Sequence, residues 1–580
     1  EPIPNHRVRG YKPGQRFYFL NILEEVNTPG DYYIDRKNNL LYFYPPALSE
    51  DSELLISMME TPIFQMRGCE NITLCGLQLE CVRGDAVVGA ETNDFVVDRC
   101  SFRNIGNYAV VMEEGRRNIV KNSTIHDCGD GGIKLRGGDR MTLEHADSAA
   151  INNHIYRVAS WSRCYQPAVK ADGVGISIRH NLIHDCPHNA ILWGGNDIII
   201  EDNEIYSVVM ETGDAGAIYA GQDITFRGNH VSHNYIHHLG GVGMGTMGIY
   251  NDDVLSGTIM ENNFFYEVGR AVMLGGGMDY VVKNNVFVKC YPAVAMDSRA
   301  SHTEFFWWPC YEQQRKNLYN ARQSFQKPND PDIVLDCTKS PYIEKYPELA
   351  KVAKVYETGV QLTASAEITR NIFCSKPLFR YYFDPRDANV EHIYDCGEPV
   401  TLTDSEKSEI FDTRHDFRAT WSPGKGDWRF AKNFTASPKD FEDAEWGLIS
   451  VRPESKAFVY GYEGEGFDSI GLIREEREET PSRVLTCLTY PYNKEEKPLT
   501  LGLRNMEDVE VSGTIELYTS NPEIRLDQKK VSFTLAPHEE RYIPVGDVSG
   551  QERFTVDARS DVPGVRPCRA ENFLGNWNRF

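Results

Sequence analysis

A short pattern of apolar and polar positions recurs along the middle of the chain. An Asn opens a short apolar strand in copies that begin at Asn181, Asn203, Asn263 and Asn285. Each copy is followed by a second apolar strand ending in Gly or Asp, and these second strands begin at Ala190, Ala217, Gly248, Ala271 and Ala293. Repetition with a period of roughly 20–30 residues indicates a solenoid, and short strands rich in β-branched residues indicate β rungs. The chain is therefore predicted to be all-β, with a parallel β-helix as its main body.

Stacking the second strands predicts which side chains point outward. In the segment Gly132-Ile-Lys-Leu-Arg, Lys134 and Arg136 must face water, and alternation along a strand then turns Ile133 and Leu135 inward. One outward column holds Glu113, Arg136, Gly194, Gly221, Asp252, Gly275 and Asp297, and the other holds Val111, Lys134, Leu192, Tyr219, Tyr250, Met273 and Ala295. We expect the glycines, aspartates and tyrosines of these columns to form one exposed floor on which a sugar can lie.

Composition narrows the classes of partner. The chain has 580 residues and a formal net charge of −23 at pH 7, which argues against binding to nucleic acid. The same charge disfavours a heavily anionic polymer as substrate unless a cation intervenes. No run of about 18 apolar residues occurs, so no membrane span is expected. The chain begins at Glu1, so its export history cannot be read: a carbohydrate substrate favours a periplasmic or extracellular location, whereas unpaired cysteines also fit the cytoplasm. Oligomeric state is left open.

Two residue types have positions that indicate structural roles. Cys128, Cys186 and Cys290 occupy the repeat position at which other rungs carry Val208 and Val268, so we expect buried thiols without disulfides. No C-x₂-C pair is present, and no metal site is predicted. Asn residues at the corners are expected to stack as hydrogen-bonded ladders: Asn122, Asn153, Asn181, Asn203, Asn229, Asn263 and Asn285.

The solenoid is predicted to have three additions. Residues 1–62 form an N-terminal hairpin or flap, with strands at 32–34 and 40–44, and lead into a β-helix over residues 63–473. Residues 301–359 have helical patterning and interrupt the solenoid, either as a lid or wall beside the floor or as the cover of a sheet edge. A charged run from Arg474 is expected to be a linker. Short alternating segments in residues 482–580 predict a β-sandwich whose role is a stabilising cap.

The candidate chemistry is a pair of carboxylates. Glycosidic hydrolysis needs one carboxyl group to protonate the leaving oxygen and another to act as nucleophile or to activate water. Asp252 and Asp297 share one outward column with Gly275 between them, roughly 10 Å apart at about 4.8 Å per rung. Asp214 lies on the loop before the Tyr219 strand and must curl over the face to reach Asp252. Asp253 is either a further catalytic carboxyl or a turn former, and any one of these aspartates alone has the alternative of a solvated corner residue.

Several of these segments resemble a known family. The run from Glu211 to Asp223, the run Gly248-Ile-Tyr-Asn-Asp-Asp-Val-Leu-Ser-Gly and the run Ala293-Val-Ala-Met-Asp-Ser-Arg are similar to right-handed parallel β-helix glycoside hydrolases. The hairpin at Gly30 and the Tyr346-Pro-Glu-Leu segment share the resemblance, which is nearest to glycoside hydrolase family 141, with its α-L-fucosidase and xylanase activities. It implies catalysis by paired aspartates on the helix face, with Asp214, Asp252 or Asp253, and Asp297 as the matching positions. Relatives carry further rungs before the hairpin, so we expect that an N-terminal portion precedes this chain.

The preferred function is therefore hydrolysis of a complex oligo- or polysaccharide, with a fucoside or xyloside expected and no cofactor. Substrate contacts are expected from Glu211, Tyr219, Tyr250, His188, Arg136 and Arg299. The first alternative is a polysaccharide lyase of a uronate polymer, which needs a basic residue such as Lys134, Arg136 or Lys170, often with Ca²⁺ held by acidic corners. The second alternative is a non-catalytic, carbohydrate-binding or structural β-helix. The site and not the fold decides among them.

Overall fold

The computed structural model describes residues 19–49, 52–239, 246–290, 292–297, 308–358, 364–374, 379–381, 393–395, 398–400, 426–464, 466–491, 496–519, 521–551, 554–560 and 562–572. The chain forms two compact units, Glu1–Ser57 and Met58–Phe580. In the first unit, a short 3₁₀ turn η1 (Leu23–Glu25) precedes an antiparallel hairpin of β1 (Tyr32–Asp35) and β2 (Leu40–Phe43). The Asn21 side chain bonds both the N–H and the C=O of Ile34 and so fixes the start of the hairpin. The predicted hairpin is confirmed.

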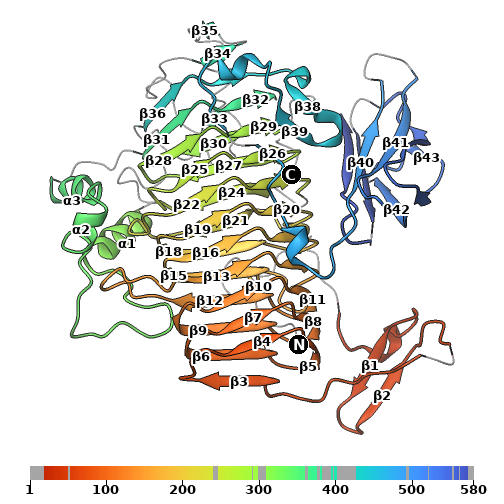
Figure 1. The fold of residues 1–580 in the computed structure, drawn as a ribbon, viewed down its shortest axis with the longest axis horizontal. Coiled ribbons are helices and arrows are strands. Elements are labelled where there is room, and N and C mark those ends of the chain that lie inside the picture. Colours follow the sequence, from red (N-terminus) through yellow and green to blue (C-terminus); the bar gives the residue numbers. More distant parts are fainter. Residues whose placement is uncertain are drawn as a thin grey trace. The chain divides into compact units, whose positions relative to one another are not determined.

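The second unit is built on three long parallel sheets (Figure 1). Sheet 1 contains, in order, β3 (Phe64–Arg67), β6 (Val87–Asn93), β9 (Val110–Arg116), β12 (Ile133–Gly137), β15 (Val169–Val174), β18 (Ile191–Asn196), β21 (Ala215–Gly221), β24 (Thr246–Asp252), β27 (Arg270–Gly275), β30 (Val294–Asp297) and β33 (Phe379–Tyr381). Sheet 2 contains β4 (Thr73–Cys75), β7 (Val96–Asp98), β10 (Ile119–Lys121), β13 (Ser148–Ile151), β16 (Ile176–Arg179), β19 (Ile199–Glu201), β22 (His230–Ser232), β25 (Ile259–Glu261), β28 (Tyr280–Lys283), β31 (Ala364–Thr369) and β36 (Gly426–Ala431). Sheet 3 contains β5 (Gln78–Val82), β8 (Ser101–Ile105), β11 (Thr124–Cys128), β14 (His154–Tyr156), β17 (Leu182–His184), β20 (Glu204–Tyr206), β23 (Tyr235–His237), β26 (Phe264–Tyr266), β29 (Val286–Val288), β32 (Ile372–Cys374) and β37 (Phe434–Thr435), and ends in the antiparallel pair β34 (Ile393–Asp395) and β35 (Glu398–Val400).

Each rung contributes one strand to every sheet, and inward residues of all three sheets share one core. The register is the one expected from the sequence: Tyr219 pairs with Tyr250, Gly221 with Asp252, and Gly275 with Asp297. The inward residues Ala190, Ala217, Ala271 and Ala293 are fully buried. The predicted fold class is confirmed. One rung was missed, however: β15 lies between β12 and β18 and adds Lys170 and Asp172 to the outward columns.

A ladder of buried Asn side chains holds the corner between sheets 2 and 3. It runs through Asn153, Asn181, Asn203, Asn234, Asn263, Asn285, Asn371 and Asn433. From Asn181 onward, each Oδ1 accepts the backbone N–H and the side-chain amide of the preceding Asn; Asn203 Oδ1, for example, accepts both from Asn181, at 3.0 and 2.9 Å. Two members of the predicted ladder are wrong. Ser123 takes the place expected for Asn122, and Asn229 lies at the corner between sheets 1 and 2, where it bonds Ile198 and Gly195.

The cysteines behave as small apolar residues. Cys128, Cys186 and Cys290 are buried and form no disulfide, which confirms the prediction. Val208 and Val268, at the equivalent positions of other rungs, are buried too. None of the cysteines in the described ranges forms a disulfide. Burial raises the pKa of the Cys128, Cys186 and Cys290 thiols, which disfavours the reactive thiolate.

The helical insertion packs on the corner that follows sheet 1. Its helices are α1 (Trp308–Tyr319), α2 (Tyr342–Lys345) and α3 (Leu349–Thr358), and they share a small core with Ile224, Val254 and Met278 of that corner. The guanidinium of Arg140, which is 1% exposed, joins the solenoid to the insertion by donating to Arg322 O at 2.7 Å. Within the described part of the chain, no helix has the length and apolarity needed to cross a bilayer.

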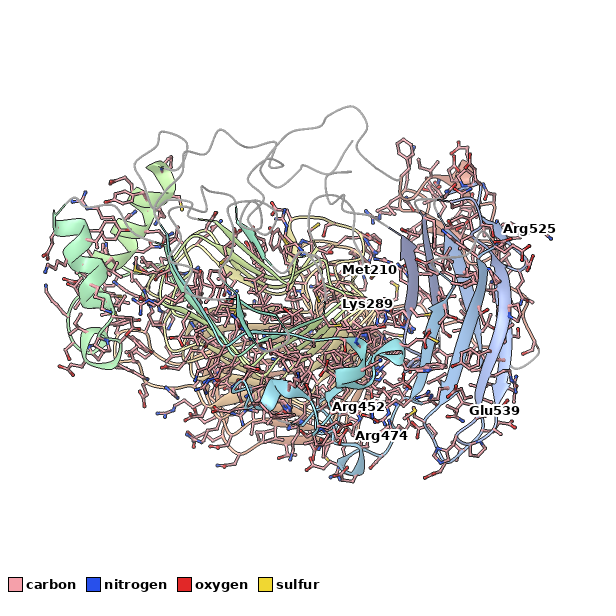
Figure 2. All side chains as sticks on the ribbon, turned by 90° about the horizontal axis from the view of Figure 1, so that it is seen from above. Met210, Lys289, Arg452, Arg474, Arg525 and Glu539 are labelled. Carbon is pink, nitrogen blue, oxygen red and sulfur yellow. The ribbon has the colours of Figure 1, made fainter. Side chains whose placement is uncertain are left out.

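After the solenoid, β38 (Phe441–Asp443) and β39 (Leu448–Val451) form a small hairpin joined by the 3₁₀ turn η4 (Ala444–Trp446). The 3₁₀ turn η3 (Pro438–Asp440) precedes it, and η5 (Lys456–Phe458) and η6 (Arg474–Glu476) follow. A C-terminal module then comprises two antiparallel sheets that enclose their own core. One sheet contains β40 (Val484–Thr489), β41 (Pro498–Asn505), β45 (Glu540–Asp547) and β43 (Arg525–Leu526); the other contains β44 (Lys530–Leu535), β42 (Val511–Thr519), β46 (Phe554–Ser560) and β47 (Cys568–Asn572). Figure 2 shows the strands of this module nearly side by side, with Arg525 and Glu539 toward opposite ends of them. The exact domain boundaries predicted above stay predictions.

Candidate active site

The outward face of sheet 1 is flanked by two series of loops. Loops from sheet 3 precede each strand and carry Trp161, Tyr165, His188 and Asp214. Loops toward sheet 2 follow each strand, and the helical insertion packs on them. Residues at the start and at the end of the sheet 1 strands can therefore act on a ligand that lies along this face.

Only part of this face is accessible. Consecutive strands β12, β15, β18 and β21 expose the half-buried side chains of Lys134, Lys170, Leu192 and Tyr219 in one column. At the next rung the expected exposure is wrong, because Tyr250 is 3% exposed, and Met273 and Ala295 beyond it are buried as well. A Cβ at Gly216 would lie 2.7 Å from the Cβ of Tyr250, so the strand before Tyr219 closes tightly over the Tyr250 side chain.

Two tyrosine hydroxyls bring two carboxylates to one place. The Tyr219 hydroxyl donates to Asp252 Oδ2 at 2.9 Å, and the Tyr250 hydroxyl donates to Asp214 Oδ1 at 3.3 Å. The two rings meet edge to face, with centroids 5.3 Å apart. Asp214 is exposed and has φ +57°, a left-handed turn that directs the loop back over the sheet. The loop thus curls over the face as the sequence required.

Tyr165 completes this cluster from the preceding loop. Its ring lies edge to face with Tyr219 at 6.1 Å and tilted against His188 at 4.7 Å, and it remains 51% exposed. Partial burial raises the pKa of Tyr165, and the carboxylates of Asp214 and Asp252 both raise it further. Both carboxylates therefore lie within electrostatic reach of one phenol. Burial, followed by Asp252, also raises the pKa of Tyr219, so the Tyr219 hydroxyl keeps its proton and donates to Asp252.

Asp252 accepts a second hydrogen bond from the backbone N–H of Asp253 at 2.9 Å. Two donors to one carboxylate favour its ionised form. A Cβ at Gly221 would lie 2.8 Å from the Cβ of Asp252, so glycine at this position leaves room for the aspartate on the neighbouring strand. Asp253 has φ +38° and accepts from Gln222 Nε2 at 3.3 Å, which gives it the geometry of a turn residue.

The other predicted site residues lie farther out or are already paired. Glu211 lies on the loop that carries Asp214, and its carboxylate accepts a hydrogen bond from Arg163 Nε at 2.6 Å. His188 is 4% exposed, and burial lowers its pKa, so its imidazole is neutral near pH 7 and packs under Tyr165. Arg136 is bound by Asp172 and Glu113, and three rungs separate β12 from β21.

Two predicted residues cannot be placed fully. The backbone of Asp297 closes β30, in register with Gly275 and two strands beyond Asp252, but its side chain lies outside the described residues. Arg299 lies entirely outside them. The described residues contain no group of three or more His, Cys, Asp or Glu side chains placed to hold a metal ion.

The helical insertion contributes an aromatic ring beside the accessible strip. The Phe325 ring lies 5.9 Å from the ring of Phe226, and a Cβ at Gly194 would be 3.3 Å from both rings and from Asp172. On α1, Asn317 donates to Gln222 O at 3.3 Å, next to the end of β21. The insertion packs on the corner that follows sheet 1, and its predicted role as a lid or wall, or as the cover of a sheet edge, stays a prediction.

Comparison with known proteins agrees with the solenoid. The model of the right-handed beta helix region matches residues 63–166 and 167–305. A solved structure described as a glycoside hydrolase is 14% identical, with a TM-score of 0.34, and covers 47% of this chain and 57% of its own length. A mutant tailspike protein of E. coli bacteriophage HK620, solved with a pentasaccharide, is 7% identical, with a TM-score of 0.29, over 82% of this chain and 75% of its own. The Dettilon tailspike protein is 10% identical, with a TM-score of 0.20, and the match covers 84% of this chain and 83% of the tailspike chain. No curated protein sequence matches the chain.

Proposed function

We propose that the chain is a glycoside hydrolase that cleaves a complex oligo- or polysaccharide at the outward face of sheet 1, with a fucoside or xyloside as the reacting sugar. The observation that supports this most is the arrangement of Asp214 and Asp252 on the two sides of the Tyr219–Tyr250 pair. Two carboxyl groups with different surroundings are what glycosidic hydrolysis uses as acid and as base or nucleophile.

The surroundings of the two groups suggest their roles. Asp252 accepts hydrogen bonds from Tyr219 and from a backbone N–H, so it is suited to act as the ionised base or nucleophile. Asp214 accepts a single longer hydrogen bond among the described residues and sits on an exposed loop, where substrate can cover it. Covering a carboxyl group removes water from it and favours the protonated form that a general acid requires. Asp297, two strands beyond Asp252, is retained as a third candidate.

The deciding experiment is to incubate the chain with plant polysaccharides and to follow both reducing ends and the ultraviolet absorbance of unsaturated uronates. Hydrolysis in ¹⁸O-labelled water is expected to place one labelled oxygen in each new reducing end, without a rise in absorbance. A rise in absorbance without label would instead establish a lyase, and the absence of both signals would establish a non-catalytic β-helix.

Tyr165 is expected to be the exposed sugar-stacking ring, in place of Tyr250. Replacing Tyr165 by Ala should raise KM about 3–10-fold with little change in kcat, because a ring contact of about 0.5–1.5 kcal/mol is lost equally from bound substrate and transition state. Tyr165→Phe should keep the KM of the parent. Tyr518→Ala, at a 49% exposed tyrosine of the C-terminal module, is the matched control. An unchanged KM for Tyr165→Ala would remove this residue from the site.

A further inference from the structure

We propose that the cations on β12 and β15 form a subsite for the carboxylate of a uronate residue in the substrate. This inference rests on the proposed function, because it assigns the sugar bound next to the cleaved part of the oligosaccharide. The subsite consists of Lys134, Arg136, Lys170 and Arg322, and Lys170 is its centre.

Lys170 differs from Lys134 and Arg136 in having no ion-pair partner among the described residues. Lys134 Nζ lies 2.8 Å from Glu113, and Arg136 lies 3.2 Å from Asp172 and 3.4 Å from Glu113. Those two cations are therefore neutralised by two carboxylates. Lys170 stands in register beside Lys134 and points out of the same face, and within the described ranges its ammonium group has neither an ion pair nor a hydrogen bond.

Three cations, Arg136, Lys134 and Arg322, act on the ammonium group of Lys170, together with the one carboxylate of Asp172. The guanidinium of Arg322, from the helical insertion, donates to the carbonyl oxygens of Ser324 and Phe325 and lies over the Phe325 ring, 4.7 Å from its centroid. Burial lowers the pKa of Lys170, and Arg136, Lys134 and Arg322 lower it further against the opposing effect of Asp172. A bound anion would remove this repulsion. Such a local excess is notable in a chain whose net charge is −23, because the rest of the molecule repels anions.

The subsite is continuous with the carboxylate cluster. Lys170, Leu192 and Tyr219 are consecutive along one accessible column, and three rungs separate β15 from β24. At about 4.8 Å per rung, this places the cations roughly 14 Å from the strand of Asp252. At this separation, the sugar bound by the cations is not the reacting sugar but one farther along the oligosaccharide. A uronate at the reacting position would be repelled by Asp214 and Asp252. The substrate class is therefore an oligosaccharide with a neutral sugar at the cleaved bond and a uronate beyond it.

The test compares binding of a xylo-oligosaccharide that carries a single glucuronate with binding of its carboxyl-reduced, neutral counterpart, measured by calorimetry on the full chain carrying Asp252→Asn. We expect the uronate-bearing oligosaccharide to bind about 10–100-fold more tightly, the range given by one charge-assisted hydrogen bond. Added salt should reduce the difference. Lys170→Met should abolish the preference and Lys170→Arg should restore it. Lys121→Met, at a lysine of sheet 2 whose side chain is 40% exposed, is the control that should retain it.

Equal affinity for the charged and neutral oligosaccharides, or a preference unaffected by Lys170→Met, would refute the subsite. A preference for a sulfated neutral xylo-oligosaccharide over the uronate-bearing one would refute the uronate assignment. Binding with the expected preference, but without cleavage by the parent chain, would refute the proposed hydrolase and retain the subsite. Formation of unsaturated uronate that Lys170→Met abolishes would make Lys170 the base of a lyase and overturn both.

Discussion

Replacing Asp252 by Asn is expected to lower kcat about 10²–10⁴-fold with the chain still folded. Asn has the same shape as Asp: its amide oxygen can accept the Asp253 N–H, and its NH2 can donate to the Tyr219 hydroxyl, which now donates to Asp252 Oδ2 at 2.9 Å and can rotate to accept. What is lost is the charge and the ability to take up a proton. Asp214→Asn should lose activity by the same order, because the amide cannot protonate the leaving oxygen.

The two variants should also be non-additive. If Asp214 and Asp252 act in one reaction, the double variant should be little slower than the slower single variant. Losing either carboxyl already stops the shared step, so losing the second adds little. Asp94→Asn, at an aspartate of the corner before β7 that is paired with Arg117, is the matched control and should keep full activity. Asp253→Asn should have a small effect, because asparagine tolerates its positive φ. Full activity in the Asp214, Asp252 and Asp297 variants would exclude the proposed mechanism.

Much of the scaffold could be predicted because strand alternation is a local property. Inward Ile and Ala and outward Tyr or Asp fix the register of each strand, and the columns through Tyr219 and Asp252 follow from that. The rung at β15 was missed because a long loop, residues 157–168, separates it from the preceding strand β14. Its sequence, Val169-Lys-Ala-Asp-Gly, nevertheless matches Ile133-Lys-Leu-Arg-Gly in alternation, and the facing pair Arg136 and Asp172 has complementary charges.

The site was harder to predict because loops complete it. Exposure of Tyr250 was inferred from its outward direction, yet the start of β21, at Gly216, closes over its side chain. Tyr165 was missed because no repeat relates residues 157–168 to another rung. The ion pairs of Arg136 and Glu211 likewise depend on contacts across rungs and between loops.

An outward column of aromatic residues on sheet 3 predicts that another part of the chain covers this sheet. In five consecutive rungs the residue after an inward Ile is aromatic. The register stacks these residues with ring centroids 4.8–5.1 Å apart: His126, Tyr156, His184, Tyr206 and His237. Most of these outward rings are buried. A continuous aromatic column on an outer face predicts a cover, and Arg566 of the C-terminal module lies over the Tyr235 ring at 5.3 Å.

The attachment of this module is expected to depend on one buried ion pair. Arg566 Nη2 lies 2.7 Å from Glu204 on β20, and both side chains are nearly inaccessible. Burial opposes the charge on Glu204, but Arg566 and His237 outweigh it and lower the pKa of Glu204 to about 2. Arg566→Met would leave the carboxylate buried without its partner and should cost about 3–5 kcal/mol, measured as a lower urea midpoint at pH 7. Arg525→Met, at an 83% exposed side chain of the same module, should cost almost nothing.

Acid should weaken the same junction in two steps. Burial lowers the pKa of His237 to about 4 from its ordinary 6.5, so the neutral ring contributes stability above pH 6.5 that is lost as the pH falls toward 4. Glu204, with a pKa lowered from 4.5 to about 2, contributes stability above pH 4.5 that is lost between 4.5 and 2. Arg566→Met combined with Glu204→Leu should recover most of the loss at pH 7 and remove the lower-pH step, because an apolar pair of similar volume needs no ionisation. An acid transition unchanged in the double variant would place the pH dependence elsewhere in the solenoid.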